Sequence, residues 1–401
     1  MTGGRQWHTR AGSGTLSAAA AIVEGAASHA VLIVGPPSVG KMTLADDLAA
    51  GLLCLTPNPA DRPCRACRGC RLVAGGNHPD LHQLGPEGPG GQVLIGDAAR
   101  PAGRGVRNLV AELAYLPVEG GHRVAIVEHA ERMNEDAQNA LLKTLEEPPP
   151  RTTIILCADE EDRLLPTVRS RCVRLRIAPL GVRAIEELLV ERTVAEAPAA
   201  ARLARIAAGR PGVAMAYARL PGAVTIHDEI ARTLLDLLAA PSSTRLVSGR
   251  ELIERAVALD AALRPPEPVA GPAARLPRGA SRSARPAAAP VVADEAESGG
   301  DAPVGKRSPA ERRRGVLILL DLWRDVALDL AIAALGGRRE VRDPALLDDL
   351  VAAAGTIRPE QIGAFLVHLD RIAELVEGNT GPELAIDVLV LAWRPAASAA
   401  A

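Results

Sequence analysis

The chain has 401 residues, enough for about two to four domains, and 46 Lys and Arg against 48 Asp and Glu give a formal net charge of -2. This near-neutral balance excludes a general polycationic coat for nucleic acid, so any DNA contact must come from a local patch or a partner. Aromatic residues are only 1% of the chain, which argues against rows of base-stacking side chains.

The apolar segments are too short to cross a membrane, because no run reaches the roughly 18 apolar residues of a spanning helix. Residues 1–30 lack the layout of a signal peptide, since their apolar run at 18–23 is short and rich in Ala. We therefore expect a cytoplasmic protein with no membrane partner. In that compartment, clustered cysteines bind metal more often than they form disulfides.

Strands are predicted to alternate with helices in the first half of the chain. Four short apolar runs indicate buried strands, at 31–34, 123–128, 152–158 and 172–177. Two helical patterns lie between them, at 41–53 and 135–147, and the second has Asn134 as a candidate N-cap and Pro148 as its stop. This alternation predicts an α/β domain whose parallel sheet has helices on both faces.

Beyond residue 178 the pattern is helical only. Helices are predicted over 224–263 and again at 316–335, 344–354, 359–376 and 381–393. Between them, residues 265–314 are dominated by Ala, Pro, Gly and Ser, and they carry too little apolar surface to offset the entropy of ordering. We predict disorder there. The basic end of this segment, Arg312–Arg314, is either solvated or a contact for nucleic acid or a partner.

Residues 35–42 nearly match the P-loop pattern G-x-x-x-x-G-K-[ST], between a predicted strand and a predicted helix. The glycines let backbone N–H groups surround phosphates, and Lys41 would neutralise the outer phosphates. Met42 stands where the pattern requires a hydroxyl for Mg²⁺, and Thr43 lies about 100° further round the helix. The segment either binds nucleotide or is a glycine turn that does not. The candidate nucleotide-binding residues are Gly35, Pro36, Ser38, Gly40, Lys41, Met42, Thr43 and Glu128.

The second nucleotide element is also altered. A P-loop ATPase normally ends a buried strand with Asp-Glu, for the metal and for the attacking water. Here Glu128 and His129 follow the strand at 123–127. Glu128 could approach a metal, whereas His129 is a weak replacement for the water-activating carboxylate. Both alterations favour a degenerate ATPase site in which binding of ATP and Mg²⁺ is weak or absent.

Four cysteines form the strongest metal signal in the sequence. Cys54 is followed by two overlapping C-x-x-C spacings, in Cys64, Cys67 and Cys70. Four thiolates match tetrahedral Zn²⁺ and leave no open position for catalysis. We therefore predict a structural zinc module at 54–70, with free or redox-active thiols as the alternative.

A run of five arginines between residues 163 and 176 precedes and enters the fourth strand. Taken alone, it reads as a solvated basic edge. Because it follows a strand of a nucleotide-binding sheet, it could instead present an arginine to a phosphate on a neighbouring molecule.

Together these residues resemble the bacterial clamp-loader family of AAA+ proteins, which holds the gamma/tau and delta-prime subunits of DNA polymerase III. The resemblance covers about residues 25–215 and the C-terminal helices only loosely. It rests on His29-Ala30, on GPPSVGK at 35–41, on the four cysteines, on NALLKTLEEPP at 139–149 and on Ser170-Arg171-Cys172.

Three departures select a type within the family. Members that hydrolyse ATP keep an intact P-loop, the Asp-Glu pair and a sensor-2 arginine, whose place Gly212 takes here. The resemblance therefore implies a delta-prime-type stator that does not hydrolyse ATP. In that type the arginine of Ser-Arg-Cys, here Arg171, acts in trans as a finger for ATP on the adjacent gamma/tau subunit.

The resemblance also implies the organisation and the partners. It implies an AAA+ domain at 1–178, a helical lid at 179–222 and a helical collar at 223–401 interrupted by 265–314. The partners would be gamma/tau and delta subunits, with the sliding clamp and primed DNA reached through the complex. The alternative is an ATP-hydrolysing gamma/tau-type motor or another AAA+ DNA-remodelling ATPase. A stand-alone DNA-binding protein would need a basic or aromatic surface that this composition does not provide.

Overall fold

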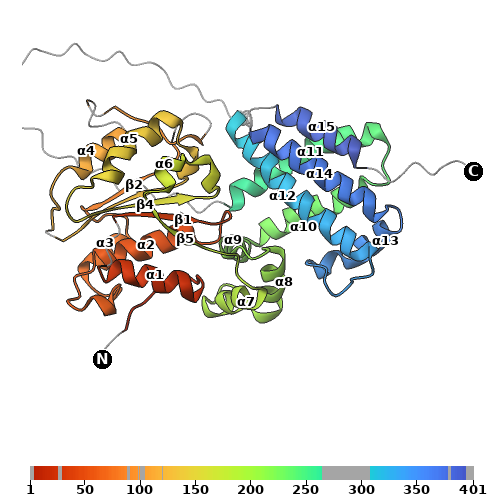
Figure 1. The fold of residues 1–401 in the computed structure, drawn as a ribbon. Helices are drawn as coiled ribbons and strands as arrows, with labels where there is room; N and C mark the ends of the chain where they lie inside the picture. Colours follow the sequence, from red (N-terminus) through yellow and green to blue (C-terminus); the bar gives the residue numbers. More distant parts are fainter. Residues whose placement is uncertain are drawn as a thin grey trace, which may run out of the picture.

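The computed structural model describes residues 4–25, 29–87, 91–97, 99, 104–119, 121–263, 308–377 and 381–393. An α/β domain and a helical region lie side by side (Figure 1). The predicted fold class, an α/β P-loop domain followed by helices, is confirmed. Among the described residues, no helix combines the length and hydropathy needed to span a membrane.

The first domain is built on a parallel sheet. Its strands are β1 (Ala30–Val34), β2 (Leu81–Leu84), β3 (Arg123–Val127), β4 (Thr152–Ala158) and β5 (Val173–Arg176). They lie in the order β2-β3-β4-β1-β5, and every pair is parallel. Four of these strands were predicted, and β2 was not. Parallel strands all end at one edge, so β1, β3 and β4 direct the P-loop, Glu128 and Asp159 to the same edge.

Helices cover both faces of this sheet, as the alternation predicted. One face carries α1 (Ser13–Val23), α2 (Lys41–Leu52) and α3 (Arg68–Ala74), and the other carries α4 (Val106–Leu113), α5 (Glu135–Glu146) and α6 (Pro166–Arg169). Alternate residues of β1 enter the two cores: Val31 and Ile33 one, Ala30 and Leu32 the other. Asn134 caps α5 as predicted, since its side chain accepts a hydrogen bond from Ala137 N at 2.9 Å. Short 3₁₀ turns occur at Pro59–Asp61, Ala130–Arg132, Glu161–Arg163 and Pro344–Leu346.

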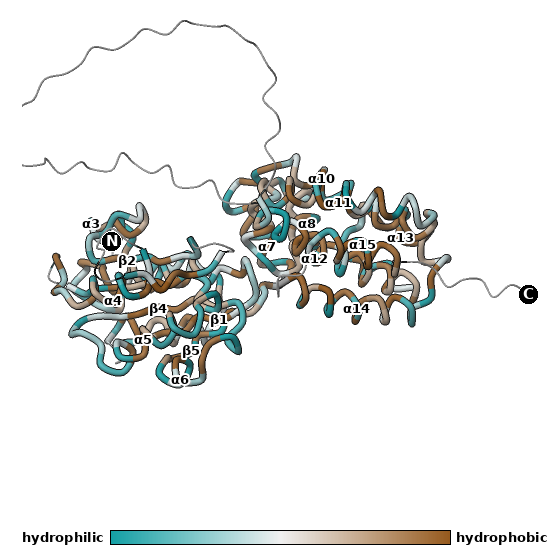
Figure 2. The backbone as a smooth tube through the Cα atoms, turned by 90° about the horizontal axis from the view of Figure 1, so that it is seen from above, coloured by the Kyte–Doolittle hydropathy of each residue, from teal (hydrophilic) through white to brown (hydrophobic). Residues whose placement is uncertain are grey.

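The helical region shares one hydrophobic core. It contains α7 (Val182–Glu191), α8 (Ala197–Ile206), α9 (Pro211–Arg219), α10 (Pro221–Asp236), α11 (Ser242–Leu263), α12 (Pro309–Ala334), α13 (Leu347–Ala354), α14 (Pro359–Glu377) and α15 (Pro382–Ala392). Trp323, Phe365 and Trp393 pack against one another in this core, with their rings tilted or edge to face. Figure 2 shows the region from above, and in it α12 packs against α10, α11 and α14. Because helices on both sides of residue 222 enter the same core, the separate lid and collar stay a prediction.

The predicted disorder of 265–314 is wrong at its C-terminal end, where residues 308–314 begin α12. Ser308 and Glu311 form a capping box around Pro309, which suits the first helical position. Arg312 pairs with Glu383 at 2.7 Å, and Arg314 lies 3.4 Å from Asp260. The basic end is therefore helical and ion-paired. Residues 264–307 lie outside the described part of the chain.

Candidate functional site

The P-loop has the backbone geometry that its sequence predicts. Gly40 adopts a φ of +100°, a left-handed conformation that favours glycine, immediately before α2. At Gly35 a Cβ would lie 2.3 Å from the carbonyl oxygen of Ile177, so only glycine fits there. The turn is therefore fixed both by its own glycine conformations and by contact with the chain that leaves β5.

Lys41 is already surrounded by oxygen atoms of its own domain. Its ammonium donates hydrogen bonds to the carbonyls of Gly35 and Pro36, both at 2.7 Å, and pairs with the Asp159 carboxylate. The residue is only 8% exposed. Its charge is therefore directed toward the loop and the end of β4, rather than held free for a phosphate.

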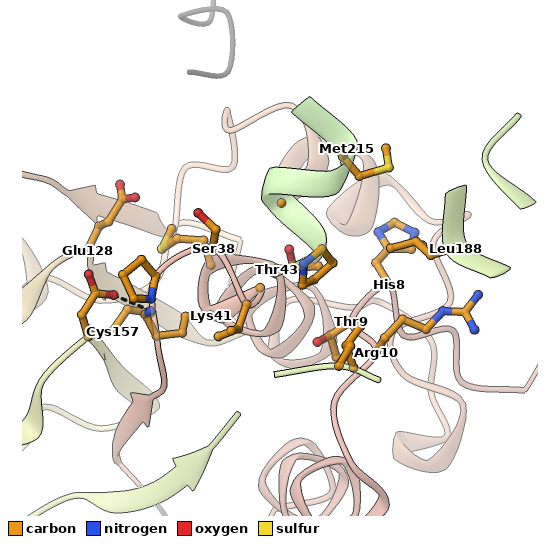
Figure 3. A pocket seen from close by; sticks show the side chains of 18 of the residues that line it. His8, Thr9, Arg10, Ser38, Lys41, Thr43, Glu128, Cys157, Leu188 and Met215 are labelled. Atoms are coloured by element: carbon orange, nitrogen blue, oxygen red, sulfur yellow. Dashed lines mark ion pairs between the residues drawn. The ribbon is translucent and has the colours of Figure 1, made fainter. Parts of the chain in front are cut away.

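The predicted nucleotide residues divide into two groups around this turn. The carbonyl oxygens of Gly35 and Pro36 accept hydrogen bonds from Lys41. The remaining six line a cleft of about 610 Å³ between the P-loop and α7 and α9: Ser38, Gly40, Lys41, Met42, Thr43 and Glu128. Figure 3 shows Lys41 and Glu128 on one side and His8, Thr9 and Arg10 on the other. The side chain of Met42 also packs against the core beneath α2.

Glu128 and His129, which follow β3, form part of a charged network. His129 has a φ of +50°, and its Nδ1 lies 3.0 Å from Glu131 Oε1 and 3.6 Å from Asp159 Oδ2. The hydrogen bond with Glu131 raises the pKa of His129, which favours the imidazolium. Glu128 is about half exposed and opens to the cleft. His129 therefore links the ends of β3 and β4 and is not a simply solvated strand-end residue.

The helical region touches the P-loop directly at Gly212. The backbone N–H of Gly212, in the first turn of α9, donates to Ser38 O at 3.1 Å. A Cβ at position 212 would stand 3.1 Å from that oxygen and 3.3 Å from Ser38 Cβ. Any larger residue would therefore have to displace the loop or the helix.

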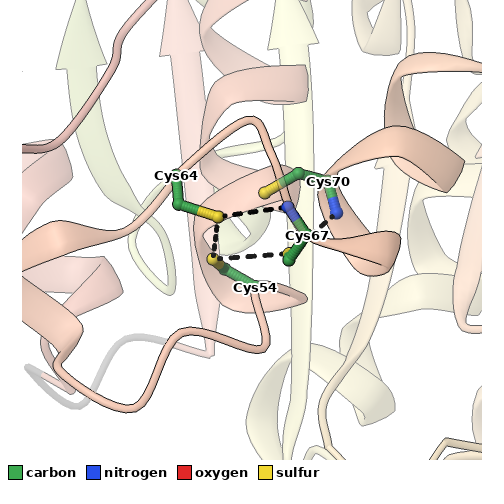
Figure 4. A group of neighbouring side chains, drawn as sticks. All are labelled: Cys54, Cys64, Cys67 and Cys70. Atoms are coloured by element: carbon green, nitrogen blue, oxygen red, sulfur yellow. Dashed lines mark hydrogen bonds between the residues drawn. The ribbon is translucent and has the colours of Figure 1, made fainter. Parts of the chain in front are cut away.

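The four predicted metal ligands come together beside α2. Cys54 Sγ lies 3.6 Å from Cys64 Sγ and 3.8 Å from Cys67 Sγ, and the four sulfurs all lie within 4.8 Å of one another (Figure 4). A tetrahedron with Zn–S bonds of about 2.3 Å has S···S separations of about 3.8 Å. The cluster therefore has the size and donor set for one metal ion.

The thiols of Cys64 and Cys70 have pKa values that are shifted in opposite directions. Burial opposes ionisation of Cys64, but hydrogen bonds from Thr56 and from the Cys67 and Ala66 backbone lower its pKa to about 6. Burial raises the pKa of Cys70. A bound metal would supply the positive charge that a buried thiolate needs.

Arg171 lies two residues before β5, away from the P-loop of its own chain. Val173 pairs with Val31 at the start of β1, whereas the P-loop follows Val34. Three residues of strand separate those positions, roughly 10 Å along the sheet. The Arg171 guanidinium donates to Thr167 O at 2.8 Å and pairs with Glu146 at the end of α5. About a third of the side chain is exposed.

The other arginines of this run are paired with an acidic stretch. Arg163 contacts Glu160 at 2.8 Å, and Arg169 contacts Asp162 at 2.7 Å. Arg174 and Arg176 both pair with Glu161. The run is therefore a set of ion pairs at the surface, and its partly exposed arginines agree with the expectation of a solvated edge.

Several residues of the site were missed in the sequence. No sequence motif marks Asp159. Its place in the site follows only from its position at the end of β4, where it pairs with Lys41. His8, Thr9 and Arg10 reach the cleft from the far N-terminus. Asp47, which accepts hydrogen bonds from His8 N and Thr9 N, lies within α2, where no motif marks it.

The first domain matches known proteins. A family described as "DNA polymerase III, delta subunit" matches residues 16–181. DNA polymerase III subunit delta' of Escherichia coli is 40% identical over 193 residues, which are 48% of this chain and 55% of that protein. The Pseudomonas aeruginosa subunit delta' is 39% identical over 186 residues, 46% and 54% of the two chains. The chain thus matches about half the length of these relatives.

More distant matches accompany these. The tau subunit of E. coli DNA polymerase III is 34% identical over 186 residues, which are 45% of this chain and 27% of that protein. The structure of a gamma subunit-related protein of Thermotoga maritima matches over 94% of this chain and 98% of its own, at 15% identity and a TM-score of 0.44. Through its first domain, the chain is similar to the delta' subunits of bacterial DNA polymerase III and, at lower identity, to tau.

Proposed function

We propose that the chain is a delta-prime-type stator of a cytoplasmic DNA polymerase III clamp loader. In this role it assembles with gamma/tau and delta subunits and helps load the sliding clamp onto primed DNA during replication. The similarity of residues 16–181 to delta' subunits supports this assignment. The higher identity to delta' than to tau favours the stator over the motor.

The contacts of Lys41 carry the proposal that the ATPase site is degenerate. An ammonium that binds two loop carbonyls and the Asp159 carboxylate must give up these partners before it can neutralise a phosphate. Met42 provides no hydroxyl for Mg²⁺, and Gly212 provides no cation from α9. We therefore expect weak or absent binding of ATP and Mg²⁺ and no hydrolysis by the isolated chain.

We also propose that Arg171 acts on a neighbouring subunit. Its place just before β5 argues against a role at its own P-loop, whereas its partial exposure suits contact across an interface. A guanidinium beside a γ-phosphate stabilises the charge that develops during phosphoryl transfer. Arg171 would then supply catalysis to a site that it does not itself contain.

We propose that Cys54, Cys64, Cys67 and Cys70 hold one structural zinc ion. The sulfur separations and the all-thiolate donor set support zinc. No ligand position would remain for water, so the ion would cross-link the loop between α2 and α3 rather than catalyse a reaction.

Reconstitution tests the proposed function. The chain is mixed with candidate tau and delta subunits, and assembly, clamp loading and ATP turnover are measured. We expect a stable complex, with turnover that survives Lys41→Ala in this chain. Turnover by the isolated chain that Lys41→Ala abolishes would instead favour the gamma/tau-type motor.

A further inference from the structure

The N-terminal segment, residues 4–12, runs from the four-cysteine loop to the nucleotide cleft, and we call it the strap. Its first part is bound along the cysteine loop. Arg5 donates to Arg62 O at 2.5 Å and to Pro59 O at 3.0 Å, and Gln6 N donates to Pro63 O at 3.0 Å. Strap and cysteine loop are therefore neighbours although they are far apart in the sequence.

The middle of the strap is held by a buried carboxylate. Asp47, in α2, is 1% exposed, and its side chain accepts hydrogen bonds from His8 N at 3.0 Å and Thr9 N at 2.8 Å. Such charge-assisted hydrogen bonds are stronger than bonds between neutral groups. Because its charge is removed from water, Asp47 also requires a cationic partner.

The cysteine loop supplies that partner. Arg65 lies between Cys64 and Cys67 with a φ of +57°, and its guanidinium pairs with Asp47 and donates to Gln6 O at 3.1 Å. Burial lowers the pKa of Arg65. The turn that aims Arg65 is the same turn that brings Cys64 and Cys67 together, with Cys67 N donating to Cys64 Sγ at 3.4 Å.

The end of the strap forms a wall of the cleft. His8, Thr9 and Arg10 line it opposite Lys41, and Arg10 continues to an ion pair with Glu191 of α7. A continuous set of contacts therefore leads from the cysteine cluster through Arg65 and Asp47 to this wall.

We propose that Asp47 and Arg65 are positioning residues that couple the metal cluster to the nucleotide cleft by fixing the strap. Loss of the metal would release the turn that aims Arg65. Asp47 would then lose its cation, and the wall at residues 8–10 would lose its order. This coupling rests on the proposed zinc site, but it is separate from the clamp-loader proposal because it concerns the free chain alone.

Amide hydrogen exchange of the full-length, zinc-loaded protein tests the coupling. Asp47→Asn removes the charge that binds the His8 and Thr9 amides, so we expect these amides to exchange about tenfold faster or more. Zinc content should stay at the level of the unaltered protein, because no ligand is changed. Asp80→Asn is the matched control, since Asp80 is also 1% exposed, accepts hydrogen bonds from Val118 N and Glu119 N and pairs with Arg123 rather than with the strap. Exchange of α12 amides reports global unfolding.

A second variant and a second probe keep the test decisive if Asp47→Asn does not fold. Arg65→Gln should also free the strap while zinc is retained. Trp7, in the strap, is only partly buried and stacks with Arg5, whereas Trp323 and Trp393 are fully buried. Acrylamide quenching of tryptophan fluorescence therefore reports mainly Trp7, and it should increase in both variants.

Removal of zinc from the unaltered protein with a chelator should reproduce the same changes. The proposal is overturned if the strap amides and Trp7 of a folded Asp47 or Arg65 variant behave as in the unaltered protein. It is equally overturned if zinc removal leaves the strap protected.

Discussion

The ion pair between Arg171 and Glu146 gives the sharpest prediction about the proposed finger. To act on a neighbour, Arg171 must exchange Glu146 for the neighbour's phosphate. The two side chains are 33% and 50% exposed, so the pair is worth about 0.2–1 kcal/mol. At about 1.4 kcal/mol for each tenfold change, Glu146→Gln should raise the rate at the one ATP site that Arg171 serves by about 1.4-fold to fivefold. Total ATP turnover of the assembled complex should rise by less, because the other interfaces are unchanged.

Removal of the finger should have the opposite effect. Arginine fingers are worth roughly 10³–10⁵ in rate where they are the main contributor, and the fall in total turnover should be smaller because other interfaces keep their own fingers. Arg171→Ala should therefore leave assembly intact and lower turnover stimulated by DNA and clamp. Arg171→Lys should rescue poorly, because lysine lacks the planar fork of donors.

The assay is steady-state ATP hydrolysis by the reconstituted complex, with assembly checked by size-exclusion chromatography. Glu147→Gln controls for loss of a neighbouring charge, and Arg169→Ala controls for loss of an arginine that pairs with Asp162. Normal turnover and clamp loading by Arg171→Ala would refute the finger. If Glu146→Gln lowers turnover as Arg171→Ala does, Glu146 holds the finger in its working position rather than restraining it.

Three further predictions concern the metal, the central segment and pH. Elemental analysis should find one zinc per chain, and a value well under one would contradict the assignment. Chelation should unfold residues 54–70, since structural zinc contributes apparent binding energies of about 10–16 kcal/mol in small peptides. Deletion of residues 265–307 should preserve folding and assembly, because this segment contains few residues that could form a hydrophobic core and because the entropy of loop closure changes slowly with loop length. Loss of soluble protein would show that the segment has a structural role. The pKa of His129 is raised in the folded protein, so its imidazolium stabilises the fold at pH values below 6.5, the ordinary pKa of histidine. This stabilisation is lost as the pH rises through the pKa of His129 in the folded protein. Thermal unfolding of His129→Asn should therefore differ more from the unaltered protein near pH 6 than near pH 8, and an equal difference would exclude this contribution.

The elements that the sequence predicts are those whose signal is local. Continuous apolar runs marked β1, β3 and β4, and an N-cap with a proline stop marked α5. β2 was missed because only Leu81 and Leu84 of its four residues are apolar. Its strand conformation comes from pairing with β3, forty residues later in the chain, which no local pattern encodes.

The site divides in the same way. The P-loop turn and the cysteine spacing are short motifs, and the structure assembles both as the motifs predict. The partner of Lys41 is not local, since Asp159 comes from a strand more than a hundred residues away. The paired state of the arginine run had a signal nearby, because residues 160–162 are all acidic.

The altered positions of the nucleotide site also depend on their new surroundings, so single reversions should not restore it. An arginine at position 212 would first have to fit its Cβ 3.1 Å from Ser38 O, where α9 now rests on the P-loop. A hydroxyl at position 42 would replace a side chain that packs on the core beneath α2. Lys41 would still be held by Asp159, which also lies beside His129. If the chain is a stator, as proposed, its P-loop region therefore serves as a packing contact between the sheet and the helical region.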